Sequence, residues 1–186
     1  MVDRVSALAG HYQTGHSGVT GQTGITLCEV PDLCLHQIAA WADTLVGVGG
    51  EAATTAGCES APGPGKAHTG SKGSLLRIEP LKWWLFGTAA GALEAEQGAV
   101  LDISHSRTHI RITGEQVVTL LNRHLPLDLR EAAFPIGSIA STALHHVGVT
   151  LWHSEEGYEL FLPRGFALSL WEGLVESAEQ FGLEIK

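Results

Sequence analysis

Charged residues are scarce in this sequence of 186 residues. Lys, Arg, Asp and Glu together make up 17% of the chain, whereas ordinary soluble domains carry about 25%. Two explanations stay open, because either other protein covers part of the surface or the many glycine and alanine residues dilute the charge. Basic residues are fewer than acidic ones, with 11 Lys and Arg against 20 Asp and Glu, and the formal net charge is −9. Nucleic-acid binding needs a basic surface that displaces counterions from phosphates, so the composition argues against it.

Long apolar runs and paired cysteines are missing as well. No segment approaches the about 20 apolar residues that a membrane span requires, and the N-terminal residues lack the apolar core of a signal peptide. We therefore expect no membrane association and a cytoplasmic location. Cys28, Cys34 and Cys58 contain no C-x-x-C spacing and cannot all pair, which favours reduced thiols.

The chain has the length of one domain, or of two small half-domains that share a core. Residues 1–24 carry repeated glycine and polar residues without periodicity, so we expect a loose N-terminal arm. Residues 25–186 are expected to form a single α+β domain. Within it, the glycine- and proline-rich stretch at about 47–73 is expected to be a flexible connection.

Apolar spacing and turn residues predict the elements of this domain. Strands are expected at 25–30, twice within 74–87 around Glu79-Pro80, at 99–104 and 107–113 as a pair, at 143–152 and 158–162 as a hairpin, and at 183–185. Helices are expected at 35–46, 114–124 and 164–180. The order predicts two related halves, each an antiparallel sheet with helices packed on one face.

The strand at 107–113 alternates cleanly between two kinds of side chain. Thr108, Ile110 and Ile112 point to one face, and the cationic or titratable side chains point to the other. These are Arg107, His109 and Arg111. They could hold an anionic ligand such as a folate glutamate tail, meet an acidic patch on a partner subunit, or form a solvated face.

Two pairs of adjacent residues are further candidates for a partner interface. Trp83 and Trp84 are expected to point to opposite faces of a strand, so one ring is core and the other is exposed unless something covers it. An exposed Trp is typical of interface hot spots, and core packing on both sides is the competing account. His145 and His146 are also expected on opposite faces of a strand, where they cannot bind one metal without a bulge.

Motifs that would give this chain its own cofactor or catalytic site are not found. Gly65-Lys66 is followed by Ala67, which breaks the P-loop pattern, and no G-x-G-x-x-G follows a predicted strand. No G-x-S-x-G elbow surrounds Ser104, and no cysteine completes a zinc pattern with the histidines. We therefore expect no catalytic, cofactor-binding or metal-binding residue in this chain.

Six sequence segments, taken in order, resemble a known family. They are IEPLKWWL, LDISHSRTHIRITG, LLNRHLPLDLR, FPIGSIASTALHHVGVTLWH, GYELFLPR and LWEGLVESAEQFGLEI, which lie between residues 78 and 185. Together they are similar to the gamma subunit of heterotetrameric sarcosine oxidase. More remotely, the chain resembles the folate-binding domain of the glycine-cleavage T-protein, an aminomethyltransferase.

The first resemblance implies a non-catalytic structural subunit of a cytoplasmic flavoenzyme complex. Such an oxidoreductase demethylates sarcosine to glycine in sarcosine catabolism and one-carbon metabolism. The one-carbon unit passes to tetrahydrofolate or leaves as formaldehyde, and hydrogen peroxide forms. The resemblance implies alpha, beta and delta subunits as partners, with direct contact to alpha. FAD, FMN, NAD, zinc and tetrahydrofolate are then expected in those other subunits and none in this chain.

The second resemblance implies a scaffold without its catalytic acid. In the T-protein, an acidic residue in the strand matching ALHHVGVT acts on the folate-linked reaction, and the best-matching positions here are His145 and His146. An imidazole cannot replace a carboxylate without changing the charge of a site. Two alternatives stay open: the equivalent subunit of a related N-methyl amino acid dehydrogenase, such as N-methylglutamate dehydrogenase, and a free-standing folate-binding, aminomethyltransferase-like protein.

Overall fold

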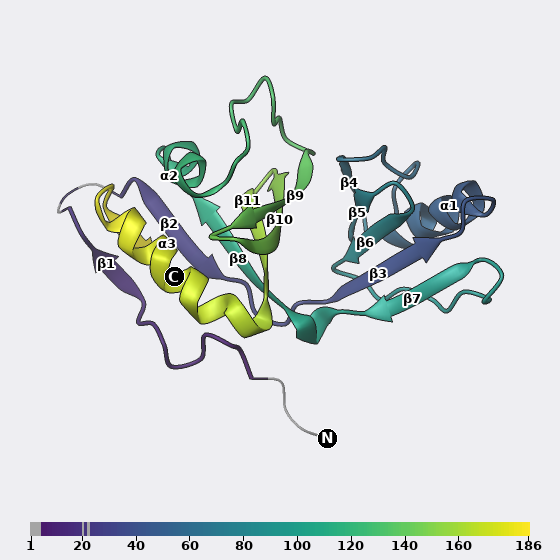
Figure 1. Cartoon of the computed structure of the whole chain (residues 1–186), viewed down its shortest axis with the longest axis horizontal. Helices are drawn as coiled ribbons and strands as arrows, with labels where there is room; N and C mark the ends of the chain where they lie inside the picture. The colour runs from purple at the N-terminus through teal and green to yellow at the C-terminus, as the bar shows by residue number, and fades with distance from the viewer. Residues whose placement is uncertain (1–4, 20, 22) are drawn as a thin grey trace. The chain divides into compact units, whose positions relative to one another are not determined.

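The computed structural model describes residues 5–19, 21 and 23–186, and the chain divides into two compact units. Unit 1 consists of Met1–Pro31, Ser106–Ile136 and Ser141–Lys186, and unit 2 of Asp32–His105 and Gly137–Ala140. Each unit is built on one sheet, and the described residues include three α-helices (Figure 1). The predicted α+β fold with two sheets is confirmed. That residues 25–186 act as one domain stays a prediction.

Seven strands form the sheet of unit 1, in the order β1-β12-β2-β8-β11-β10-β9. They are β1 (Gly15–Ser17), β2 (Ile25–Glu29), β8 (Arg107–Thr113), β9 (Ile139–Leu144), β10 (Val147–Ser154), β11 (Gly157–Pro163) and β12 (Leu183–Ile185). β12 runs parallel to β2, whereas β2 and β11 run antiparallel to β8. The predicted hairpin is confirmed as β10 and β11, which pair from Ser154 opposite Gly157.

Helices α2 (Val117–His124) and α3 (Ala167–Glu179) belong to unit 1. α3 lies against the sheet of unit 1 (Figure 1), where it contacts β11 and β12. The helix expected at 164–180 is confirmed as α3, in which the apolar residues Leu170, Trp171 and Leu174 are buried. Phe166 lies in a short 3-10 turn before α3 and is 53% exposed.

The described part of the segment expected to be a loose arm packs on unit 1. Leu8 is fully buried, and β1 pairs with β12. The Tyr12 ring lies 4.9 Å from the Trp171 ring, and the Tyr12 hydroxyl donates a hydrogen bond of 3.3 Å to Glu29. Glycine-rich composition hid this order, because a strand of three residues leaves no periodicity to detect. Residues 1–4, 20 and 22 lie outside the described part of the chain.

Unit 2 is a five-stranded sheet in the order β4-β5-β6-β3-β7 with helix α1 (Leu45–Ala56) against it (Figure 1). Its strands are β3 (Leu35–Ala40), β4 (Ala67–Thr69), β5 (Ser74–Glu79), β6 (Lys82–Phe86) and β7 (Gly98–Asp102). The two strands expected around Glu79-Pro80 are therefore confirmed. The expected pair at 99–104 and 107–113 is wrong, since β7 and β8 belong to different sheets.

Helix α1 and strand β3 contradict the expectations for residues 35–73. Residues 35–40 of the predicted helix at 35–46 form strand β3, which pairs with β6 on one side and β7 on the other, and only the last two residues of that predicted helix are helical, at the start of α1. The stretch predicted to be a flexible connection contains α1 and β4. α1 forms despite its glycines because Val48, Ala52 and Ala56 are buried in the core of unit 2, and tertiary packing overrides weak helix propensity. None of the helices in the described ranges is long and apolar enough to cross a membrane.

Candidate functional site

Strand β8 carries three of the seven candidate residues, and buried side chains lie on both of its faces. Thr108, Ile110 and Ile112 are buried, which confirms the predicted core face. On the other face His109 is 1% exposed, whereas Arg107 and Arg111 are partly exposed. The interpretation of this face as solvated is therefore wrong for His109. The reason is that β8 lies inside the sheet, where the His109 ring contacts Glu159 and Phe161 of the neighbouring strand β11.

His109 is held by a buried carboxylate from the neighbouring strand. In the β8–β11 register His109 lies opposite Phe161, so Glu159 is its diagonal neighbour two residues away, within side-chain reach. The His109 Nε2 atom lies 2.7 Å from Oε2 of Glu159, and both side chains are at most 1% exposed. The imidazole also stacks on the Phe161 ring at 4.6 Å. Together these contacts fix the position of the ring.

The second oxygen of Glu159 is engaged as well. The Arg111 Nε–H donates to Oε1 over 2.8 Å, and the Ser154 hydroxyl donates to the same oxygen over 2.9 Å. The Arg111 guanidinium also forms an ion pair with Glu156 in the β10–β11 turn. We call these five residues (His109, Arg111, Ser154, Glu156 and Glu159) the buried ionic network. It connects β8, β10 and β11.

The buried ionic network keeps Glu159 ionised inside the protein. Burial alone would raise the pKa of Glu159, but the hydrogen bond and charge of His109, together with Arg111 and Ser154, outweigh it and lower the pKa. Arg111 is thus ion-paired within this chain, which disfavours the hypothesis that it holds a folate glutamate tail. For Arg107, burial lowers the pKa of the guanidinium. Its contact with a partner stays a prediction.

Sequence reasoning missed Glu159, Ser154 and Glu156. The detectable signal was a single carboxylate inside the apolar run Tyr158–Leu162, where a strand buried on both faces does not alternate. A lone charge in such a run calls for a partner of opposite sign, and the strand at 107–113 offers three candidates. The identity of that partner depends on the strand register, which the sequence alone does not contain.

His145 and His146 are not on a strand, so the expectation for them is wrong. They form the two-residue turn between β9 and β10. Their φ angles are 46° and 68°, which is the left-handed region that a type I′ turn requires at both positions. Asn-Gly is the preferred sequence there, and a left-handed residue other than glycine costs about 1–3 kcal/mol. The surrounding structure must therefore hold this turn in place.

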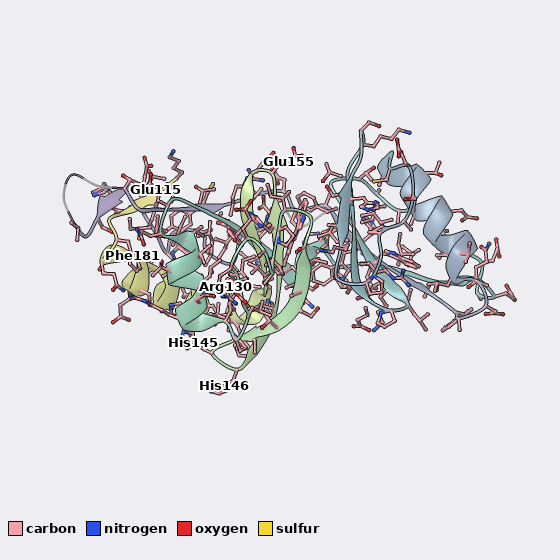
Figure 2. All side chains as sticks on the ribbon, turned by 90° about the horizontal axis from the view of Figure 1, so that it is seen from above. Glu115, Arg130, His145, His146, Glu155 and Phe181 are labelled. Atoms are coloured by element: carbon pink, nitrogen blue, oxygen red, sulfur yellow. The ribbon has the colours of Figure 1, made fainter. Side chains whose placement is uncertain are left out.

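Helix α2 supplies part of that support through His124. The His124 Nδ1 atom lies 3.1 Å from Nε2 of His145. Figure 2 shows His145 beside α2, whereas His146 points away from the protein. Burial, His145 and Arg123 together lower the pKa of His124, which favours the neutral imidazole near pH 7. The sequence predicts only that His124 ends the helix at 114–124, because nothing in the sequence brings it to residue 145.

Trp83 and Trp84 are both core residues of unit 2. They are 1% and 3% exposed, so core packing on both faces is the account that the structure supports. The Arg77 guanidinium lies 5.2 Å from the centre of the Trp83 ring, and the Trp84 indole donates to Gln37 over 3.4 Å. A direct role of these rings in partner binding stays a prediction.

A hollow of about 300 Å³ opens in unit 1 where α2 begins and α3 ends. Figure 2 labels Glu115 and Phe181 in its wall. Glu115 is the charged residue among the seven that line it. A carboxylate in the wall raises the energy of an anion placed there, so this hollow does not suit an anionic folate tail. The described residues contain no group of three or more side chains arranged to hold a metal ion.

The arrangement of strands and helices is shared with two solved structures. A chain of heterotetrameric sarcosine oxidase from Corynebacterium sp. U-96, in complex with pyrrole 2-carboxylate, matches with a TM-score of 0.74 and 23% identity over 88% of both chains. Aminomethyltransferase T of the glycine cleavage system from Bartonella henselae matches with a TM-score of 0.61 and 15% identity. That match covers 88% of this chain and 48% of the other. The fold is therefore aminomethyltransferase-like.

Three curated relatives share one name, sarcosine oxidase subunit gamma. The chain is 33% identical over 92 residues to sarcosine oxidase subunit gamma from Arthrobacter sp., which is 50% of this chain and 45% of that protein. It is 31% and 30% identical to the subunits of the same name from Corynebacterium sp. strains U-96 and P-1. Those matches span 52% and 59% of this chain, and 48% and 55% of the relatives. The chain spans about half the length of the curated relatives it matches, and no family model matches it. The resemblance to the sarcosine oxidase gamma subunit is confirmed.

Proposed function

We propose that this chain is the non-catalytic, structural gamma subunit of a heterotetrameric sarcosine oxidase. The observation that carries the proposal is the similarity to three relatives named sarcosine oxidase subunit gamma, each about half covered. The fold match over 88% of both chains with a chain of such an oxidase supports it. The chain would act as part of the oxidoreductase and not as an enzyme by itself.

The chemistry would belong to the other subunits. Sarcosine, dioxygen and water would give glycine, formaldehyde and hydrogen peroxide, with two electrons passing from the substrate C–N bond through flavin to dioxygen. Tetrahydrofolate would accept the one-carbon unit when it is present. We propose that FAD, FMN, NAD, zinc and the folate site lie in the alpha, beta and delta subunits. In this chain, the buried ionic network has a structural role, because Glu159 already accepts hydrogen bonds at both oxygens.

Affinity purification of the tagged chain from its source organism tests the proposal. We expect flavin-containing subunits to co-purify, and the complex to consume oxygen and form hydrogen peroxide when sarcosine is added. Activity with N-methylglutamate and an electron acceptor other than oxygen would instead identify the dehydrogenase. A chain that binds tetrahydrofolate and captures no flavoprotein would contradict the proposal and favour the free-standing alternative.

The candidate interface can be tested in the same complex. Of the seven predicted residues, Trp83, Trp84 and His109 are buried in this chain, so we propose that Arg107, Arg111, His145 and His146 offer the contact with alpha. Arg107→Glu should weaken capture of the alpha-type subunit, because like charges across an interface are costly. Arg130→Glu is the matched control, since Arg130 is 80% exposed and pairs with Asp128 in a loop. Equal capture by both variants would remove Arg107 from the interface.

A further inference from the structure

The contact between His124 and His145 brings together two imidazoles from distant parts of unit 1. His124 ends α2, and His145 opens the turn between β9 and β10. A Cβ atom built on Gly173 of α3 would lie 3.7 Å from Nε2 of His145, so the ring also lies beside the backbone of α3. The His145 ring is therefore positioned by two helices and a left-handed turn.

The geometry of the two rings fits a shared ion. Their interacting nitrogens are 3.1 Å apart, and their centres are 5.0 Å apart with 66° between the planes. With metal–nitrogen bonds of about 2.0–2.1 Å, this nitrogen separation corresponds to an angle of about 98° at the ion, between octahedral and tetrahedral values. The ring centres would then be about 4.8 Å apart, against about 5.4 Å for a head-on N–H···N hydrogen bond. The observed distance of 5.0 Å between the ring centres is nearer the value for a shared ion.

We propose that His124 and His145 bind one first-row transition-metal ion of the class that prefers imidazole, namely Zn²⁺, Co²⁺, Ni²⁺ or Cu²⁺. Neutral imidazole suits these ions. No third side chain in the described ranges completes a cluster with the pair, so water fills the remaining positions. The inference rests on the geometry of unit 1 and is independent of the proposed function.

The surroundings of the two imidazoles bear on how strongly the site binds an ion. Nε2 of His124 is buried without a hydrogen-bond partner, and binding through Nδ1 places the ring proton on that nitrogen. That nitrogen lacks a partner with or without the ion, so the small number of protein ligands sets the strength: two imidazoles, with water at the remaining positions, make an exchangeable site. The neighbouring cation is Arg123, whose guanidinium lies over the Phe181 ring at 4.8 Å. The neighbouring acids are Glu172 and Glu176, two exposed residues that precede and follow Gly173 in the sequence of α3.

A matched pair of variants in one turn tests this site. His145→Asn and His146→Asn each remove one imidazole and place a residue that tolerates the left-handed turn. The full chain, purified with a histidine-free tag and freed of metal, is titrated with Zn²⁺ by calorimetry. We expect His145→Asn to weaken Zn²⁺ binding at least tenfold and His146→Asn to change it less than twofold. Zn²⁺ should raise the melting temperature of the wild type and of His146→Asn only.

Electron paramagnetic resonance with Cu²⁺ identifies the ligands directly. The wild type is expected to show two imidazole nitrogens on the ion, and His124→Gln or His145→Asn should each leave one. Zn²⁺ binding that survives His145→Asn, equal loss in the two turn variants, or a wild type that binds no metal would each overturn the proposal. These results do not depend on whether the chain assembles with flavin subunits.

Discussion

Replacing Glu159 by glutamine is expected to destabilise unit 1 strongly. In the wild type, Glu159 accepts hydrogen bonds from His109, Arg111 and Ser154 at its two oxygens. Glutamine keeps the shape of the side chain but turns one acceptor into an NH₂ donor. That donor then faces His109 on one side, or Arg111 and Ser154 on the other. With 1% of the side chain exposed, water cannot replace the lost acceptor.

The size of the effect follows from the same geometry. Removing one partner of a buried ion pair costs about 3–5 kcal/mol, because a charge stays buried without compensation. Arg111 is 30% exposed and keeps its ion pair with Glu156, which limits the loss. We therefore expect the free energy of unfolding of unit 1 to fall by about 3 kcal/mol. Glu156→Gln is the matched control, since Glu156 is 65% exposed and such a surface pair contributes about 0–1 kcal/mol.

Hydrogen exchange measured by mass spectrometry gives the free energy of opening of β8 and β11 separately from unit 2. The wild type and both variants are compared at pH 7 and in mild acid. Because the pKa of folded Glu159 is lowered, its stabilisation is present above about pH 4.3 and is lost as the pH falls through the folded-state pKa. The difference between wild type and Glu159→Gln should shrink over that range. A loss at pH 7 below 1 kcal/mol, or equal losses in the two variants, would refute the reasoning.

Three further predictions have defined outcomes. Gly50→Ala should raise the stability of unit 2 by up to about 1 kcal/mol, because its Cβ meets no atom within 4 Å. Gly49→Ala should raise the stability less or lower it, because its Cβ would lie 3.1 Å from Trp83. Chemical denaturation compares the two variants. Arg111→Glu should unfold unit 1 at least as severely as Glu159→Gln, since it places a third carboxylate in the buried ionic network, and loss of exchange protection in β8 would report it. Cys58 should be alkylated at pH 8 more slowly than in the denatured chain, because burial raises the pKa of its thiol, as timed mass spectrometry can measure.

The sequence predicted elements best where one face of a strand or helix differs chemically from the other. β8 was found because Ile110 and Ile112 alternate with charged residues. α3 was found because its apolar residues recur every three or four positions and are the residues that face the sheet. In these segments, local pattern and tertiary packing require the same residues, so the pattern alone was sufficient.

Prediction failed where packing outweighs local pattern. β3 lies between two strands and is buried at Leu35, Ile38 and Ala40, so its apolar residues resemble a helical stripe. α1 is rich in glycine, yet one of these glycines lets Trp83 approach within 3.1 Å of where a Cβ would stand. The side-chain contacts of the candidate site could not be predicted from the sequence for a related reason. The pairing of His109 with Glu159, and of His124 with His145, depends on which elements meet in three dimensions.

The order of segments along the chain has a consequence for how the protein folds. Unit 2 interrupts unit 1 between β2 and β8, two strands that pair directly with each other. Closing this excursion of about 74 residues in an unfolded chain would cost about 4 kcal/mol of entropy. Within unit 2, His36 of β3 already lies opposite Asp102 of β7, near the two ends of the excursion. If unit 2 folds first, it brings β2 and β8 together and removes most of that entropic barrier. Unit 1 then has to close only a short loop between these two strands.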